Sequence, residues 1–249
     1  MKARTGQREF SVASGDNDAA IPPACTLCGV RSLTVCAPLD NAGLTAVDEI
    51  ATRHTFEPGQ TIFDEGEPSQ HLFNVTDGTV KIYKLLADGR RQITGFLFSG
   101  DFLGLASEAT YTYSAEAVTT TKLCCFRHGQ LDELLQRSPQ MERRLLAIAG
   151  HELAEAQEQM LLLGRKTAKE RVASFLLLLS RRAKQTGRSE DPVHVPMNRT
   201  DIADYLGLTT ETVSRTFTKL KLEGLIRLLP KSMVALADRQ QLSDIAETS

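Results

Sequence analysis

Turn signals recur at near-regular intervals between Thr55 and Asp101, and they constrain the fold of the N-terminal half more than any other feature. The sharpest are Asp77-Gly78 and Asp88-Gly89, because Asp-Gly between strand-like runs favours a tight hairpin. Runs rich in β-branched and aromatic residues separate the turns; they are 60–63, 72–75, 80–86, 92–98 and, further on, 118–126. This spacing predicts an antiparallel β-roll over residues 39–137.

The hydrophobic period changes after Ser138-Pro139, a typical helix start with Ser as N-cap and Pro in the first turn. Apolar or small side chains then recur at steps of three and four residues; they are Leu146, Ala149, Leu153, Ala156, Met160 and Leu163. Such a seam predicts a helix over 138–166 that pairs with a second copy of the chain. A short seam can also pack on its own domain. Glu152, Glu155 and Glu158 are expected on the other face.

Residues 199–220 carry the steric pattern of a helix-turn-helix unit. Ala203 is the small residue where two helices cross, Gly207 takes the positive-φ turn, and Val213 holds the second helix against the first. Thr209 or Thr210 is the expected cap of that second helix.

The second helix of this unit is suited to reading DNA. Its exposed face would carry Thr210, Glu211, Ser214, Arg215 and Lys219. Arg pairs with guanine, Glu accepts from cytosine, and Ser donates or accepts, so the N-terminal part of the helix fits base edges in the major groove. Arg199, Thr200 and Lys219 are better placed for phosphates. The alternative is an ordinary helical hairpin with a surface ion pair between Glu211 and Arg215.

Charge is distributed unevenly along the chain. The net charge is −2, yet residues 165–231 contain 14 Lys or Arg against 7 Asp or Glu. A basic C-terminal third is typical of a module that contacts a phosphate backbone. Segments 224–228 and 233–236 flank a turn at Lys231 and predict the two strands of a wing. Residues 167–249 are therefore expected to form a winged helix-turn-helix, in a chain of the α+β class.

Five cysteines lie before residue 126; they are Cys25, Cys28, Cys36, Cys124 and Cys125. Residues 1–20 are polar without the apolar stretch of a secretory signal, so we expect a disordered leader. No apolar run approaches the roughly 18 residues of a membrane span, and a cytoplasmic, reducing location is expected. In that setting a cysteine-rich loop over 21–38 is more typical of a metal or redox site than of disulfides.

Taken together, the roll, the seam helix and Glu211-Thr212-Val213-Ser214-Arg215 resemble the CRP/FNR superfamily of bacterial regulators, over about residues 25–236. Glu-x-x-Ser-Arg resembles the recognition helix of the FNR (fumarate and nitrate reduction regulator) branch. Met160-Leu161-Leu162-Leu163, followed by 165–171, resembles the FNR junction between dimer helix and DNA domain. The resemblance implies a homodimer that binds TTGAT-type inverted repeats and contacts RNA polymerase through 85–91 and 118–121. No catalytic motif is present, so an enzyme is not expected.

The cyclic-nucleotide pocket of the superfamily is altered in this sequence. Members that bind cyclic AMP use an Arg on the phosphate and a Glu on the ribose. Tyr113 stands where the Arg would be, and Leu105 or Ala106 where the Glu would be. A buried phosphodiester without a cation is costly, so no cyclic nucleotide is expected to bind.

The cysteine spacing resembles the 4Fe–4S site of FNR proteins, in the version of α-proteobacterial relatives. The resemblance implies Cys25, Cys28 and Cys36 as ligands, with Cys124 as the fourth. Adjacent strand residues point to opposite faces, so Cys124 and Cys125 are not expected to bind together. Four thiolates also suit structural zinc, which stays open beside haem or direct thiol oxidation as the input.

The resemblance also implies a mechanism. An intact cluster orders the loop at 21–38 and stabilises the dimer, and oxygen reverses this. Glu158 is expected to keep the cluster-free protein monomeric by like-charge repulsion across the seam.

Overall fold

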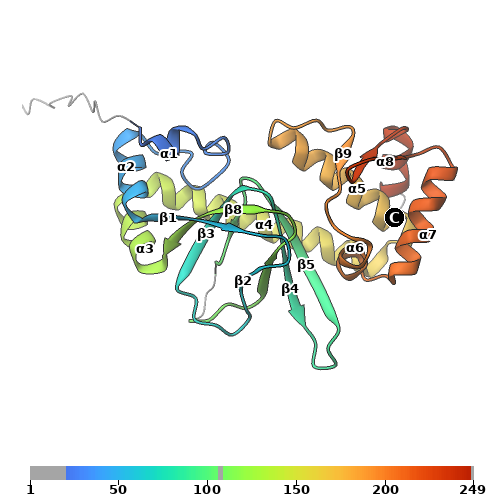
Figure 1. The fold of residues 1–249 in the computed structure, drawn as a ribbon, viewed down its shortest axis with the longest axis horizontal. Helices are drawn as coiled ribbons and strands as arrows, with labels where there is room; N and C mark the ends of the chain where they lie inside the picture. The colour runs from blue at the N-terminus through green and yellow to red at the C-terminus, as the bar shows by residue number, and fades with distance from the viewer. Residues whose placement is uncertain (1–20, 106–108, 248–249) are drawn as a thin grey trace, which may run out of the picture.

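The computed structural model describes residues 21–105 and 109–247, and it shows two lobes joined along one long helix (Figure 1). The predicted disordered leader at 1–20 lies outside the described residues. The N-terminal lobe opens with α1 (Pro23–Thr26) and α2 (Asn41–Ile50). The Asp40 side chain caps α2 by accepting from the amide of Gly43.

The N-terminal lobe is a β-roll of two antiparallel sheets. Its described strands are β1 (Ala51–Phe56), β2 (Thr61–Phe63), β3 (His71–Asp77), β4 (Thr79–Leu85), β5 (Arg91–Phe98), β6 (Phe102–Leu103), β7 (Ser114–Ala117) and β8 (Thr121–Arg127). The sheet orders are β1-β8-β3-β6 and β2-β7-β4-β5. The predicted roll and α+β class are confirmed, but β1 and β7 were not among the predicted strands. β1 carries mostly exposed polar side chains, which hides its strand character.

One glycine turn shows why the turn signals shape this roll. Gly78 joins β3 to β4 with φ of 93°, and an added Cβ would come 2.6 Å from the carbonyl oxygen of Thr120. Both the positive φ and the close backbone approach require glycine.

The long helix is α4 (Pro139–Arg165), which follows α3 (His128–Arg137). Met141 and Leu162 are buried against the chain's own lobes, whereas Leu146, Leu153 and Met160 of the predicted seam are 61–66% exposed. The structure therefore leaves an apolar stripe along α4 uncovered in the single chain.

The glutamates of α4 differ from expectation. Glu155 does not lie on a free face, because it accepts from Arg182 of the next helix at 2.6 Å, and Glu152 is half-buried beside it. Glu158 is exposed but lies two residues from both Ala156 and Met160. Residues two apart do not share a helix face. Glu158 therefore lies off the apolar stripe of the single chain, and its repulsion across the seam stays a prediction.

The C-terminal lobe is a winged helix-turn-helix. It contains α5 (Ala168–Gln185), β9 (Val193–His194), α6 (Arg199–Leu206), α7 (Thr210–Leu222), β10 (Arg227–Leu229), β11 (Met233–Ala235) and α8 (Arg239–Glu247), with sheet order β10-β11-β9. α5 begins with a capping box between Thr167 and Glu170. The predicted wing is present, and β9 adds a third strand to it.

The two lobes share one hydrophobic core. Tyr83, Ile93 and Phe96 of the β4–β5 hairpin pack with residues of α5, α6 and α7, and the Phe96 and Tyr205 rings lie 5.1 Å apart. α6 is therefore held against the roll by apolar contacts as well as by the ion pairs described below.

Candidate nucleic-acid interface and cysteine site

The turn between α6 and α7 has the geometry that the sequence predicts. Gly207 has φ of 62°, and Ala203 and Val213 are buried where the helices cross. Thr209, rather than Thr210, caps α7 by accepting from the amide of Thr212 at 3.1 Å. The unit is therefore a complete helix-turn-helix, with α7 as its second helix.

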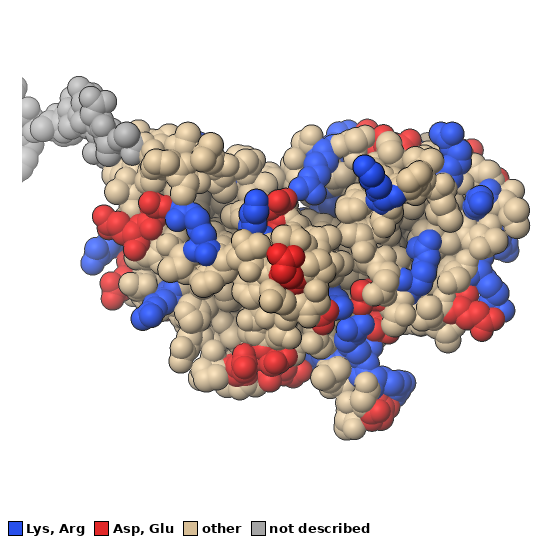
Figure 2. Space-filling model, in the orientation of Figure 1, with Lys and Arg blue, Asp and Glu red and all other residues tan. Residues whose placement is uncertain are grey.

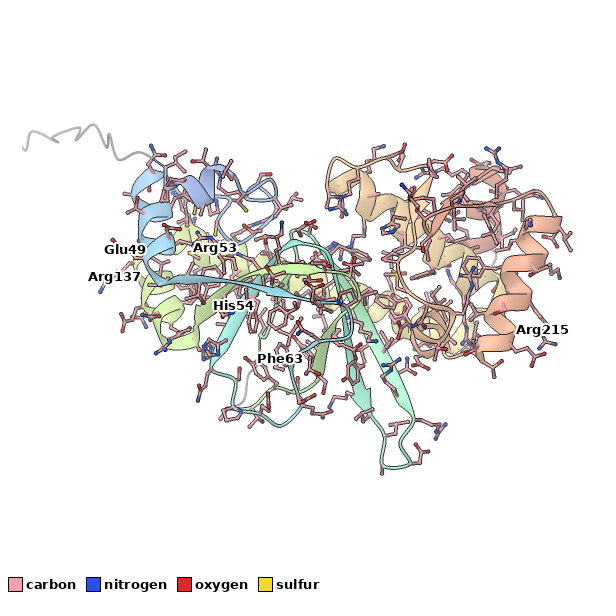
Figure 3. All side chains as sticks on the ribbon, in the orientation of Figure 1. Glu49, Arg53, His54, Phe63, Arg137 and Arg215 are labelled. Atoms are coloured by element: carbon pink, nitrogen blue, oxygen red, sulfur yellow. The ribbon has the colours of Figure 1, made fainter. Side chains whose placement is uncertain are left out.

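The outer face of α7 is exposed and polar, as expected of a recognition helix. Glu211 and Arg215 are 75% and 70% exposed and lie 3.5 Å apart. Arg215 stands on the side of α7 that faces away from the N-terminal lobe (Figure 3). Ser214 donates to the carbonyl of Thr210 at 2.9 Å, so its hydroxyl would have to rotate to meet a base. The exposed ion pair between Glu211 and Arg215 is weak, so both side chains can exchange it for contacts with DNA.

The three residues expected to contact phosphates differ in their exposure. Thr200 and Lys219 are exposed, and basic side chains are spread over the visible face of this lobe (Figure 2). The Arg199 guanidinium instead lies 3.5 Å from the Phe217 ring centroid, and burial lowers its pKa. Arg199 thus also serves to pack α6 on α7, a cation–π role that spacing did not reveal.

The junction between α4 and the helix-turn-helix converges on Arg171 of α5. Its guanidinium donates to the carbonyls of Leu163 (2.9 Å), Lys166 (2.8 Å) and Leu206 (2.7 Å). These carbonyls lie at the C-terminal ends of α4 and α6, where helix carbonyls lack partners within the helix. Arg171 therefore fixes the angle between the seam helix and the DNA-binding unit.

The five cysteines divide into two groups. Cys25, Cys36 and Cys124 pack in one apolar cluster, whereas Cys125 is buried in the roll core on the other side of the sheet. Cys28 lies near Cys25 and Cys36. Its charge, like that of Cys25, contributes to the raised pKa of Cys36. Strand alternation thus separates Cys124 from Cys125, and Cys124 is the one that faces the loop.

Burial dominates the chemistry of these thiols. It raises the pKa of Cys36 to about 11 and that of Cys124 to about 12, with further contributions from the neighbouring cysteines. Within the described residues no three His, Cys, Asp or Glu side chains are arranged around a single ion position. The four thiols share a neighbourhood without forming a tight mononuclear site.

Polar groups surround the four thiols, and one of them, Arg53, also pairs with Asp48. Arg53 and Asn74 flank Cys124 on the strands to either side of β8, and Asn74 donates to the Cys36 sulfur at 3.9 Å. Arg31 Nη1 and Asn74 Oδ1 are buried without hydrogen-bond partners among the described residues. Figure 3 places Arg53 on the loop side of β1 and His54 on the opposite side. A bound metal group would convert several of these thiols to thiolates. The two arginines and the Asn74 amide suit such a group, because hydrogen bonds and nearby positive charge stabilise sulfur ligands.

The cysteine loop is tied directly to α4. Arg144 of α4 donates to the carbonyls of Leu33 and Thr34, which lie between Cys28 and Cys36. Gly100 of the roll supports the loop from below, because a Cβ there would come 2.9 Å from the Leu33 side chain. The loop is therefore linked by hydrogen bonds to the helix that carries the apolar seam.

Tyr113, which stands where cyclic AMP binders are expected to carry an arginine, makes a hydrogen bond within the roll. The amide of Gly104 donates to the Tyr113 hydroxyl at 3.1 Å. Burial raises the pKa of Tyr113 to about 12, with Glu152 as a further contributor, so the neighbouring charge is an acid and not a cation.

Comparison with known proteins agrees with this architecture of roll, long helix and winged helix-turn-helix, which defines a DNA-binding regulator. Residues 53–138 match the cyclic nucleotide-binding domain, and residues 170–245 match the Crp-like helix-turn-helix domain. The nitrogen fixation regulation protein FixK of Bradyrhizobium diazoefficiens is 42% identical over 82% of this chain and 86% of its own length. The transcriptional activator protein FnrL of Cereibacter sphaeroides is 38% identical over 89% of this chain and 91% of its own length.

A solved structure extends the comparison to three dimensions. FixK2 from Bradyrhizobium japonicum superimposes with a TM-score of 0.75 at 38% identity, over 80% of this chain and 99% of that one. The chain therefore belongs to the CRP/FNR family of transcription regulators. Its similar relatives are FNR-type regulators and not enzymes. No described helix has both the length and the apolar content to cross a membrane.

Proposed function

We propose that the chain is an oxygen-responsive, homodimeric regulator of anaerobic or microaerobic genes that acts in the cytoplasm, where its DNA target lies. The observation that carries the proposal is the gathering of Cys25, Cys28 and Cys36, on a loop that Arg144 ties to α4, beside Cys124 of β8. The names of its relatives FnrL and FixK add support, because both are regulators of the same family.

The four thiols are the proposed ligands of a 4Fe–4S cluster. Such a cluster, when bound, supplies iron–sulfur bonds that oxygen breaks. Arg31 and Arg53 would balance the negative charge of the thiolates, and Asn74 would donate to a sulfur. With the thiols bound, the loop would keep the carbonyls of Leu33 and Thr34 in place to accept from Arg144. These hydrogen bonds would keep the seam of α4 aligned for a second copy.

On DNA, the two α7 helices of a dimer would enter successive major grooves about one helical turn apart. Glu211, Ser214 and Arg215 would read a TTGAT-type half-site, while Thr200 and Lys219 contact phosphates. Contacts of the β4–β5 hairpin with RNA polymerase complete the proposal for activation. No cyclic nucleotide is required, because Tyr113 already occupies the Gly104 amide.

Iron and acid-labile sulfide analysis of anaerobically purified protein tests the cofactor, together with a visible spectrum. We expect a brown protein with about four irons per chain. A colourless protein that contains zinc would leave the DNA-binding function in place and remove the oxygen sensor. A haem spectrum, or a metal-free protein whose DNA binding follows thiol oxidation, would point to the other inputs.

A further inference from the structure

Arg182 of α5 is held by carboxylates from two other parts of the chain. Its guanidinium donates to Asp101 of the roll at 3.1 Å and to Glu155 of α4 at 2.6 Å. We call these two ion pairs the Arg182 bridge. The Arg182 side chain is only 14% exposed, so it is largely shielded from solvent where the three elements meet. One guanidinium therefore joins the roll, the long helix and the DNA-binding lobe.

The roll holds Asp101 in a fixed position. The second oxygen of its carboxylate accepts from the amide of Phe98 at 2.8 Å, and its backbone carbonyl accepts from the amide of Val75 in β3. Burial raises the pKa of Asp101, whereas the charge of Arg182 acts to lower it. A buried carboxylate is stabilised by such a cation. Asp101 is therefore a firm anchor for Arg182 on the roll.

A cavity of about 160 Å³ lies beside the Arg182 bridge. Its wall includes Phe98 of the roll, Leu179 of α5 and Met233 of the wing. Atoms on either side of a void make no contact across it. At this place the orientation of α5 therefore depends on the Arg182 bridge, and not on close packing between the lobes.

Arg171 fixes the other end of α5. Positions 171 and 182 are 11 residues apart in one helix, which is close to three turns and roughly 16 Å along the helix axis. The two arginines therefore lie on the same face of α5. A helix that is held at one point can pivot about it, whereas two points on one face fix its direction.

The direction of α5 sets the direction of the recognition helix. Phe175 and Leu176 of α5 share one core with Val213 and Phe217 of α7. A close-packed core transmits displacements from one helix to the next. In a dimer the two α7 helices must enter half-sites at a fixed separation. A change in the direction of α5 would therefore change the separation that the dimer fits.

We propose that Arg182 is a positioning residue for DNA binding, and that it sets the spacing of half-sites that the dimer accepts. It acts through α5 and makes no contact with DNA. Its bridge to Asp101 and Glu155 holds the DNA-binding lobe on the roll and α4, so that the two α7 helices meet DNA at one separation. The inference does not depend on what the cysteines bind, so it and the proposed oxygen response can fail separately.

Dissociation constants for two DNA duplexes test this role under anoxic conditions. The first duplex is the inverted repeat that the parent protein selects from a randomised library, and the second has one base pair inserted between its half-sites. The variants are Arg182→Gln and Glu155→Gln. Arg181→Gln is the matched control, because Arg181 is the neighbouring residue of α5 and is exposed. Urea unfolding and light scattering show whether each variant is folded and dimeric.

The inserted base pair turns one half-site by about 35° relative to the other, so a rigid dimer cannot fit both duplexes. We expect the parent and Arg181→Gln to bind the first duplex about tenfold more tightly than the second, a difference of about 1.4 kcal/mol. In Arg182→Gln and Glu155→Gln this ratio should fall to about threefold or less. A variant that is merely less stable would lose affinity for both duplexes and keep the ratio.

Glu155→Gln leaves Arg182 paired with Asp101, so it carries the test even if Arg182→Gln does not fold. The proposal is overturned if the folded variants keep the ratio of the parent, if Arg181→Gln loses it as well, or if the parent accepts both spacings equally. Equal DNA binding by the parent with and without oxygen would instead contradict the oxygen response, and the comparison of the two duplexes would be unaffected.

Discussion

At the scale of single residues, the two adjacent cysteines of β8 can be compared directly, because their side chains point to opposite faces of the sheet. Cys124 faces Cys36 and the loop, whereas Cys125 is buried in the roll core near Phe73. We expect Cys124→Ala to abolish iron incorporation during anaerobic reconstitution. Cys125→Ala should keep it, at a cost in stability of about 1 kcal/mol for the lost sulfur contacts. Iron per chain in the two variants is the measurement, and loss of iron from Cys125→Ala alone would reverse the assignment.

Glu152 of α4 gives a pH-dependent prediction at the same scale. Burial raises its pKa from 4.5 to about 7, and the neighbouring carboxylates of Asp101 and Glu155 add to this, while Arg182 opposes it. The folded state therefore binds a proton more tightly than the unfolded state, and stability falls as pH rises from 4.5 to 7. Above pH 7 the charged form destabilises the fold.

Glu152→Gln should consequently raise the free energy of unfolding by about 1–3 kcal/mol at pH 8 and change it little at pH 4.5. Urea unfolding at the two pH values checks this. An equal effect at both would mean that the titration of Glu152 does not couple to folding.

At the scale of elements, the β4–β5 hairpin and α6 are joined by a buried ion network. Lys81 of β4 lies 3.1 Å from Asp201 of α6 and 2.8 Å from Glu116, and Arg91 lies 2.8 Å from Asp201. The Lys81 and Asp201 side chains are 7% and 4% exposed. Removing one partner of such a pair leaves a buried charge, which costs several kcal/mol.

A double-mutant cycle measures this link. Lys81→Met and Asp201→Asn should show a coupling energy of about 1–3 kcal/mol in unfolding experiments, since both act in one network. Lys84 on the same strand pairs with Glu65 at 2.7 Å but is 49% exposed, so the matched cycle there should give about 0.5 kcal/mol. Similar coupling in both cycles would show that the network does not hold α6 on the roll.

The elements also show what the sequence could predict. The helix-turn-helix followed from Ala203, Gly207 and Val213 because its packing is local and steric. The roll followed from turns such as Asp77-Gly78, where backbone geometry requires glycine. Lys81 with Asp201, and Arg144 with the loop carbonyls, join residues about 110 to 120 positions apart. Such contacts depend on how distant segments pack together, so no local sequence pattern predicts them.

The cysteine site could likewise be predicted only in part. Spacing and resemblance indicated Cys25, Cys28 and Cys36. Strand alternation required a choice between Cys124 and Cys125, and the structure places Cys124 in the cluster of Cys36 and Cys125 in the roll core. Arg53 and Asn74 could not be found, because their place beside Cys124 depends on the pairing of β1 and β3 with β8.

At the scale of the whole molecule, the exposed stripe on α4 is expected to be the dimer interface. Leu153 lies in its middle and is 61% exposed in the single chain. Leu153→Glu should give monomers under anoxic conditions, because a pair of buried like charges would face each other across the seam. Ala154→Glu adds the same charge one residue away from the stripe and should leave dimers intact. Light scattering after gel filtration distinguishes the two, and dimers of Leu153→Glu would place the interface elsewhere.

In the proposed function, the cysteine thiols control the pairing of two DNA-binding lobes. The most direct test of this control is the dissociation constant for a TTGAT inverted repeat, measured without oxygen and again after exposure to air, in the parent and in Cys28→Ser. The parent should bind tightly without oxygen and lose affinity by about tenfold or more in air, a change of about 1.4 kcal/mol. Cys28→Ser should match the air-exposed parent under both conditions. Tight anoxic binding by Cys28→Ser, equal to that of the parent, would contradict the account.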